Sequence, residues 1–242
     1  MNNIKLDILA FGAHPDDVEL GCAGTLIKEI QRGKKVGIID LTQGEMATRG
    51  NPQLRAKESQ AAADILGISV RENLNFNDAF IFNDESHQMK VIAALRKYKP
   101  KVVLCNALRD RHTDHAKASE LVRHACFLSG LPRIETQDEQ GNMQTAFRPQ
   151  HVFHYIQWEE LSPDFVVDIS GFLPKKMEAI RAFKSQFYDP KSEENESFIS
   201  TKEFMDFIKS RSIEMGHSIG VKHGEGFTSE NKLKLTSLDS LF

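Results

Sequence analysis

The sequence is poor in features that mark secreted, membrane-bound or nucleic-acid-binding proteins. It has three cysteines in 242 residues, at positions 22, 105 and 126, and no CxxC pair. We therefore expect reduced, buried thiols rather than a disulfide framework or a cysteine-based zinc site. No apolar run approaches the roughly 20 residues of a membrane span. The net charge of −3 offers no general attraction to nucleic acid or to a membrane surface.

The N-terminal stretch likewise lacks the basic region, long apolar region and cleavage site of a targeting segment. Together these absences favour a cytoplasmic protein without a nucleic-acid or membrane partner.

The first half of the chain alternates strand-like and helix-like segments. Apolar runs at "IKLDILAFGA", "KKVGIIDLT", "ENLNFND" and "KVVLCNA" predict strands. Residues spaced for helices follow each of them, over 17–33, 53–66, 86–98 and 114–128. This order predicts an α/β fold with a Rossmann-like, mostly parallel sheet and helices on both faces.

The second half of the chain has a looser pattern. It predicts strands at 150–158 and 164–170 and helices at 171–187 and 201–215, with polar loops at 135–148 and 189–197. The chain has no internal repeat and no low-complexity tract, so we expect one domain over residues 1–242.

The first strand-to-helix turn lacks the glycines of a nucleotide site. It reads "GAHPDD", which offers two carboxylates where a dinucleotide or P-loop site needs G-x-G-x-x-G or a similar glycine-rich loop. Ligands of open α/β sheets bind outside the carboxyl ends of the strands. The fourth strand ends in "CNALRDRHTDH", so two clusters of histidine and aspartate should meet at the active-site edge of the sheet.

These clusters are explained only in part by helix capping. Aspartates near a helix start complement its dipole, but capping accounts for no histidine. Imidazole and carboxylate form the ligand set of catalytic zinc, which has three protein ligands and an open position. Further groups would then remain for proton transfer and orientation.

The paired motifs "AHPDD" and "RHTDH" resemble the LmbE-like, or PIG-L, family of zinc-dependent N-acetylglucosamine deacetylases. The resemblance extends over nearly the whole chain, through "DLTQGEMATRGNPQLRAKE", "KSQF" at 184–187 and "GVKHGEGF" at 220–227. The "GEMATRG" segment and the length are most similar to the bacillithiol-pathway branch, which deacetylates N-acetylglucosaminyl malate. One departure is His223-Gly224, where family members often carry Tyr-Ala.

The resemblance implies a metal site of His14, Asp17 and His115. Two imidazoles and one carboxylate leave Zn²⁺ with net positive charge and an open position. Fe²⁺ accepts the same ligands. Asp16 then resembles the general base of the family.

The second motif implies a further catalytic pair. His112 matches a residue that stabilises the tetrahedral oxyanion, and we expect Asp114 to hold the His112 ring in its charged form. Asp110 matches a family position without an assigned role.

Arginines after the second strand are the candidates for binding substrate. Arg55 matches a substrate-contacting arginine of the family, and Arg49 is our candidate for the carboxylates of malate. Arg109 is a weaker candidate. The expected partner is a small N-acetylated glucosaminide, and the resemblance also implies a homo-oligomer. Phenylalanines at 183, 187, 204 and 207 are expected in the core or a subunit interface.

Two alternatives remain open from the sequence. The chain could deacetylate another N-acyl amino sugar with the same metal site, or it could bind metal or sugar without catalysis. Retention of both Asp16 and His112 argues against the non-catalytic alternative, because a binding protein needs no general base.

Overall fold

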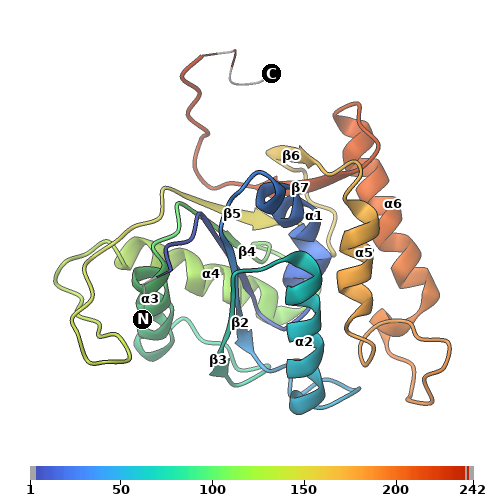
Figure 1. The fold of residues 1–242 in the computed structure, drawn as a ribbon, viewed down its shortest axis with the longest axis horizontal. Coiled ribbons are helices and arrows are strands. Elements are labelled where there is room, and N and C mark those ends of the chain that lie inside the picture. The colour runs from blue at the N-terminus through green and yellow to red at the C-terminus, as the bar shows by residue number, and fades with distance from the viewer. Residues whose placement is uncertain (1–3, 238, 240–242) are drawn as a thin grey trace.

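A single seven-stranded sheet crosses the computed structural model, which describes residues 4–237 and 239. The strands are β1 (Ile8–Gly12), β2 (Val36–Thr42), β3 (Val70–Phe76), β4 (Val102–Cys105), β5 (His151–Tyr155), β6 (Phe165–Asp168) and β7 (Gly224–Thr228). Their order is β3-β2-β1-β4-β5-β7-β6 (Figure 1). Strands β1 to β5 pair in parallel, whereas β7 runs antiparallel to both of its neighbours. The predicted mostly parallel α/β fold is confirmed.

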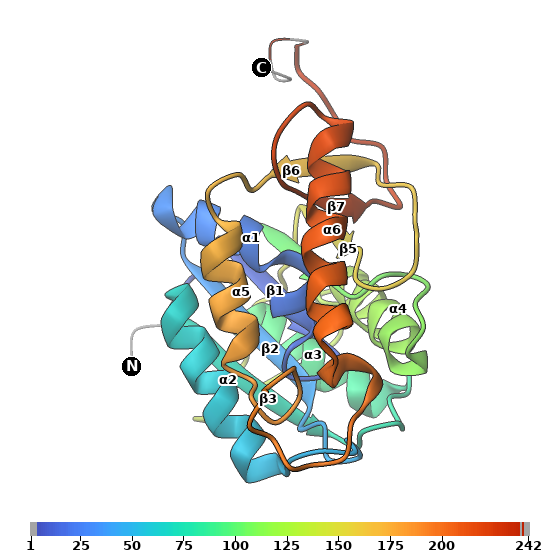
Figure 2. The ribbon, with the colours of Figure 1, turned by 90° about the vertical axis from the view of Figure 1, so that its right-hand side faces the viewer.

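Helices cover both faces of this sheet (Figures 1 and 2). They are α1 (Asp17–Gln31), α2 (Pro52–Leu66), α3 (Glu85–Tyr98), α4 (Thr113–Leu128), α5 (Leu173–Arg181) and α6 (Lys202–Ser218), with a short 3₁₀ helix η1 (Phe198–Ser200). Helices α3 and α4 pack together on one face, α1, α2 and α5 pack together on the other, and α6 lies against β7. Separate apolar cores fill the two faces. Among the described residues, no helix combines the length and apolar character of a membrane span.

The second half differs from the sequence expectation in two places. The helix expected over 171–187 ends at Arg181, and the chain continues through turns that bury Phe183 and Phe187. Strand β7 was not expected at all. Its sequence, "GEGFT", has two glycines and little apolar periodicity, so its pairing with β5 and β6 decides its conformation.

Residues from the second half of the chain support helix α1 at the point where it is interrupted. Helix α1 has non-helical angles at Cys22 (φ −143°, ψ 15°). The carboxylate of Glu225 on β7 accepts the N–H groups of Gly24 at 2.9 Å and Thr25 at 2.7 Å. Lys176 of α5 lies 2.7 Å from the same carboxylate, and both side chains are buried. A charged pair from the second half therefore supports the first helix of the sheet.

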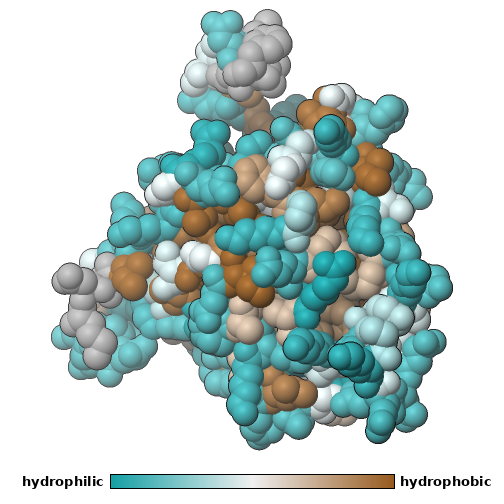
Figure 3. Space-filling view, turned by 45° about the vertical axis from the view of Figure 1, so that its right-hand side comes forward, coloured by the Kyte–Doolittle hydropathy of each residue, from teal (hydrophilic) through white to brown (hydrophobic). Residues whose placement is uncertain are grey.

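The cysteines are free and buried, as predicted. Phe80, Phe82, Phe127 and Ile213 are each more than half exposed, and apolar residues are interspersed with polar ones on the face of Figure 3. Homo-oligomerisation stays a prediction.

Candidate active site

The ends of strands β1 and β4 bring the two predicted motifs together. These strands are parallel neighbours, so the turn after β1 and the start of α4 lie at the same sheet edge. Asp17 lies there between the imidazoles of His14 and His115. Its Oδ1 is 3.1 Å from Nε2 of His115, and its Oδ2 is 3.6 Å from Nδ1 of His14. The structure thus brings together the three residues predicted to bind metal.

Each of these imidazoles has a carboxylate partner on its other ring nitrogen. His14 Nε2 lies 3.0 Å from Asp78, and His115 Nδ1 lies 2.8 Å from Asp110. Such partners fix the tautomer and the ring orientation of metal-binding histidines. The structure therefore gives Asp110, which had no expected role, a position as the partner of His115. It also identifies Asp78, which follows β3 and was not singled out from the sequence, as the partner of His14.

The surplus of buried carboxylates shifts the pKa values of this cluster. Burial lowers the pKa of His14, but hydrogen bonds to Asp114, Asp17 and Asp78 outweigh burial and raise it well above its usual value. Burial also lowers the pKa of His115, yet its aspartate partners raise it to about 9. Without a metal, protons on the rings balance the carboxylates. A divalent cation can replace these protons, so this donor set fits a metal such as Zn²⁺.

His112 lies beside the same cluster but is exposed. Its ring centroid is 4.6 Å from that of His14 and 5.1 Å from that of His115. Its Nδ1 accepts the backbone N–H of Asp114 at 3.3 Å, which leaves Nε2 to carry the ring proton. Partial desolvation beside the cluster and the neighbouring imidazolium charges lower its pKa. His112 lines the cavity, and its Nε2 is the ring nitrogen that this hydrogen bond leaves available as a donor.

The Asp114 side chain differs from its expected position. Its carboxylate accepts the N–H of Ala79 at 2.8 Å and lies 3.5 Å from His14 Nε2. It makes no hydrogen bond to the ring of His112 among those the described residues form. The expected contact between the Asp114 carboxylate and the His112 ring is thus not formed, and Asp114 lies beside His14 instead.

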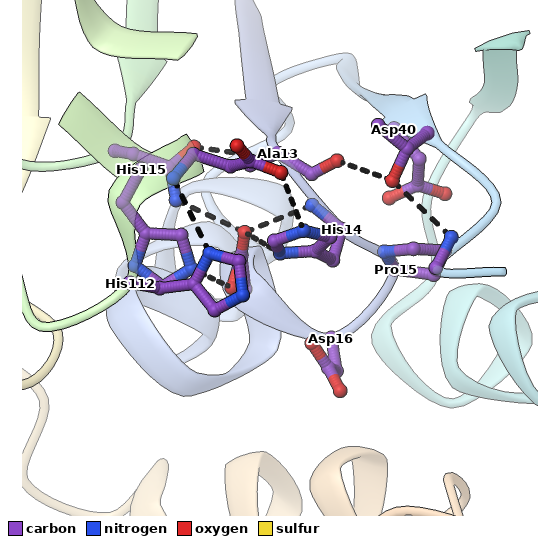
Figure 4. Close-up of polar contacts among 12 residues, drawn as sticks. Ala13, His14, Pro15, Asp16, Asp40, His112 and His115 are labelled. Carbon is purple, nitrogen blue, oxygen red and sulfur yellow. Dashed lines mark hydrogen bonds and ion pairs between the residues drawn. The ribbon is translucent and has the colours of Figure 1, made fainter. Parts of the chain in front are cut away.

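Asp16 has an unusual backbone conformation and a buried carboxylate. Its φ is +121°, in a region that favours glycine. The carboxylate points away from the imidazole rings (Figure 4) and lies 2.8 Å from Nη2 of Arg55, which also donates to the carbonyl of Pro15. Burial raises the pKa of Asp16 to about 7, against the opposing charge of Arg55. A carboxylate with such a pKa suits a general base at neutral pH.

Arg55 lines the cavity, as a substrate contact would, but its guanidinium is already used to hold Asp16. Arg49 also lines the cavity and is buried. It donates to Ser192 at 2.5 Å and to Glu194 at 3.2 Å, both on the loop before η1.

The prediction that Arg109 is a weaker candidate for substrate binding is corrected by the structure. Arg109 pairs with Glu159 at 2.6 Å, is exposed, and is absent from the cavity lining. Arg111, which the sequence had not singled out, does line the cavity, with its guanidinium 4.1 Å from the ring centre of Phe198. Which of the closely spaced arginines turns inward depends on the loop conformation, so composition alone does not distinguish them.

A cavity of about 580 Å³ opens beside the cluster, in the size range of small-molecule sites. One side, here called the polar wall, consists of His14, Asp16, Asp17, His112 and His115. Another part of the lining, here called the aromatic wall, consists of the mutually packed rings of Trp158, Phe198, Phe204 and Phe207. Phe204 and Phe207 therefore contribute to a ligand cavity as well as to packing, beyond the core or interface role expected for them.

The departure at His223-Gly224 has a packing explanation. His223 is absent from the cavity lining, whereas Gly224 is part of it. A Cβ at Gly224 would lie 2.8 Å from the backbone nitrogen of Gly216 on α6. Glycine at this position therefore allows the backbones of α6 and β7 to approach closely.

Comparison with known proteins agrees with this geometry. Residues 9–126 match the family model described as PIG-L: GlcNAc-PI de-N-acetylase. A diacetylchitobiose deacetylase from Thermococcus kodakarensis is 28% identical over 77% of this chain and 72% of its own. The uncharacterized deacetylase YaiS of Escherichia coli is 32% identical over 65% of this chain and 85% of its own length.

Two further relatives differ in the reaction they are named for. A probable N-acetyl-α-D-glucosaminyl L-malate deacetylase from Bacillus anthracis is 28% identical over 77% of this chain and 84% of its own. A 4-oxalmesaconate hydratase from Pseudomonas putida is 27% identical over 77% of this chain and 76% of its own length.

The fold agreement extends along the chain. The crystal structure of the conserved protein TT1542 from Thermus thermophilus superposes with a TM-score of 0.85 at 34% identity, covering 96% of this chain and 98% of that one. The histidine–aspartate cluster lies at the end of the first and fourth strands, inside the segment that the family model matches. The chain belongs to the PIG-L, or LmbE-like, deacetylase family.

Proposed function

We propose that this chain is a metal-dependent deacetylase. Its reaction is hydrolysis of the acetamide of an N-acetylglucosaminyl conjugate, with N-acetylglucosaminyl L-malate as the substrate, which releases acetate and the free amine for bacillithiol synthesis. The observation that carries the proposal is Asp17 between two imidazoles, at the edge of a cavity that Asp16 and His112 also line. The malate deacetylase relative supports the choice of substrate.

His14, Asp17 and His115 would hold the metal. A bound Zn²⁺ would supply Lewis-acid polarisation of the acetamide carbonyl and would make a nearby water more acidic. Once a metal replaces one proton on each ring, Asp78 and Asp110 would hold the remaining proton on the opposite ring nitrogen and so orient the ligating nitrogens.

The remaining residues of the polar wall move a proton and stabilise charge. Asp16 accepts a proton from the attacking water and returns it to the leaving amine. Arg55 keeps the Asp16 carboxylate in place through its 2.8 Å contact. The Nε2–H group of His112 faces the cavity and donates to the oxyanion that develops on the acetamide.

Arg49 is the proposed contact for the malate group. A guanidinium binds a carboxylate through two parallel hydrogen bonds, and Arg49 already pairs with the carboxylate of Glu194. Glu194 is half exposed, so a substrate carboxylate can take its place without leaving Arg49 buried and unpaired.

The aromatic wall favours a second candidate substrate, a disaccharide of N-acetylglucosamine. Trp158 lies with its ring centre 4.6 Å from that of Phe198 and presents apolar surface to the cavity. The apolar face of a second sugar ring can pack against such a surface. The diacetylchitobiose deacetylase relative supports this candidate.

The test is acetate release from N-acetylglucosaminyl malate, diacetylchitobiose and N-acetylglucosamine, each with zinc-loaded, Fe²⁺-loaded and chelator-stripped protein. We expect the malate conjugate to react fastest and all activity to disappear on chelation. If diacetylchitobiose reacts fastest, it would replace N-acetylglucosaminyl malate as the proposed substrate. Sugar binding without acetate release from any of the three would overturn the deacetylase proposal in favour of a binding protein.

A further inference from the structure

The carboxylate of Asp17 receives hydrogen bonds from residues that neither motif contains. It is 2% exposed, so water does not satisfy its oxygens. An ionised carboxylate offers about four acceptor positions, two on each oxygen. Hydrogen-bond donors already occupy some of these positions. The oxygen that keeps a free position is the one available to a metal.

Asn106 occupies a position on Oδ2. It follows β4 directly and is fully buried. Its Oδ1 accepts the N–H of Ala13 at 2.9 Å, which fixes the orientation of the amide. Its Nδ2 therefore faces Asp17 and donates to Oδ2 at 3.0 Å. The backbone N–H of His14 donates to the same oxygen at 2.9 Å, so Oδ2 has two hydrogen-bond donors, while Nδ1 of His14 lies further away at 3.6 Å.

Gln157 occupies a position on Oδ1. It follows β5, and its Nε2 donates to Oδ1 at 2.7 Å. Its own Oε1 faces Nδ2 of Asn106 at 3.4 Å, so the two amides orient each other. Arg211 of α6 holds the backbone of this segment by donating to the carbonyl of Gln157 at 2.7 Å. Oδ1 keeps one acceptor position, the one that faces Nε2 of His115 at 3.1 Å.

We propose that Asn106 and Gln157 are positioning residues that make Asp17 a metal ligand through Oδ1 alone. Asn106 and the His14 backbone fill Oδ2, and Gln157 turns the free position of Oδ1 toward His115. Because both side chains are neutral amides, they orient the carboxylate without neutralising the charge that a cation needs. The inference builds on the metal site of the proposed function and adds one residue from the end of β4 and one from the end of β5.

The test compares Gln157→Met with the wild-type protein. Methionine has a similar length but donates no hydrogen bond, and Gln157 is only partly buried. We expect Zn²⁺ affinity, measured by competition with a chromogenic chelator, to fall roughly 10–100-fold. The melting temperature of the metal-free protein should stay within a few degrees, because no apolar contact is lost. Gln186→Met is the matched control, since Gln186 lines the same cavity but donates to the carbonyl of Arg49 at 2.9 Å.

A second variant, Asn106→Ser, tests the single-oxygen coordination. It frees one acceptor position on Oδ2 while the His14 backbone keeps the other, so we expect coordination by both oxygens, a higher coordination number and weaker visible absorption of the Co²⁺-loaded variant than of wild type. Unchanged Zn²⁺ affinity in Gln157→Met, or an equal fall in Gln186→Met, would overturn the positioning role. An unchanged Co²⁺ spectrum in a folded Asn106→Ser protein would overturn coordination through Oδ1 alone.

These readouts separate the inference from the proposed function. A wild-type protein that binds Zn²⁺ but releases no acetate would overturn the deacetylase while leaving the affinity comparison intact. A wild-type protein that binds no divalent metal would overturn both.

Discussion

The polar wall and the aromatic wall face the same cavity but are built in different ways. The polar wall comes from short turns at the ends of β1 and β4, where buried side chains such as Asp17 and His115 have several polar partners. The aromatic wall comes from the second half of the chain, where Trp158, Phe204 and Phe207 pack ring against ring. A network of polar contacts fixes one wall, and apolar packing fixes the other.

The difference suggests a division between chemistry and specificity. Strand ends in a parallel sheet hold catalytic groups rigidly, whereas segments outside the sheet can change without disturbing them. Relatives named for different substrates are consistent with such a division. We therefore expect substitutions in the polar wall to change kcat and substitutions in the aromatic wall to change KM.

The largest expected effect is that of Asp16→Asn. Loss of the general base should lower kcat by roughly 10²–10⁴-fold, because proton transfer in the transition state is lost. Asn keeps the side-chain volume, so Zn²⁺ content, measured by elemental analysis, should not change. Near-normal turnover in this variant would remove Asp16 from the mechanism.

A somewhat smaller loss is expected for His112→Leu. Removing one donor to the oxyanion should lower kcat by roughly 10²–10³-fold while KM changes little. Steady-state kinetics at saturating Zn²⁺ provide the measurement. If KM rose while kcat stayed unchanged, His112 would be a substrate-binding residue. The assignment of kcat effects to the polar wall would then be wrong for this residue.

Trp158→Ala tests the aromatic wall. Loss of one aromatic contact should raise KM roughly tenfold, which corresponds to about 1.4 kcal/mol, with kcat within a few-fold of wild type. The change should be greater for diacetylchitobiose than for N-acetylglucosamine. A parallel fall in kcat would show that the aromatic wall also positions the reacting amide.

The smallest effect is expected for Arg49→Ala. Arg49 exchanges one carboxylate partner for another on binding, so the net gain is modest, and KM for the malate conjugate should rise only several-fold. KM for plain N-acetylglucosamine should stay unchanged, because this sugar carries no carboxylate. Equal changes for both substrates would assign Arg49 to loop packing instead.

The sequence predicts the polar wall better than the aromatic wall for a physical reason. His14 and Asp17 follow β1 closely, His115 lies in the first turn of α4, the helix after β4, and parallel neighbouring strands bring their ends together. Trp158 and Phe204 meet only because α6 folds back along β7, a contact that depends on a strand without a clear sequence pattern.

Single polar residues after strands escaped the sequence interpretation for another reason. Asp78, Asn106 and Gln157 each lie one or two residues beyond a strand, but none belongs to a cluster that demands a ligand. Their position at the carboxyl end of β3, β4 or β5 was nevertheless a usable signal. Asp114 illustrates the opposite case, since adjacency to His112 in sequence did not place its carboxylate against that ring.

The positive φ of Asp16 has an evolutionary consequence. A side chain in such a conformation costs of order 1–3 kcal/mol, so folding alone would favour glycine at this position. A lineage that kept this fold but no longer needed the reaction would gain stability by losing the carboxylate, provided that Arg55 changed with it. Descendants that have abandoned catalysis should therefore be recognisable by glycine at position 16 together with loss of the arginine at position 55.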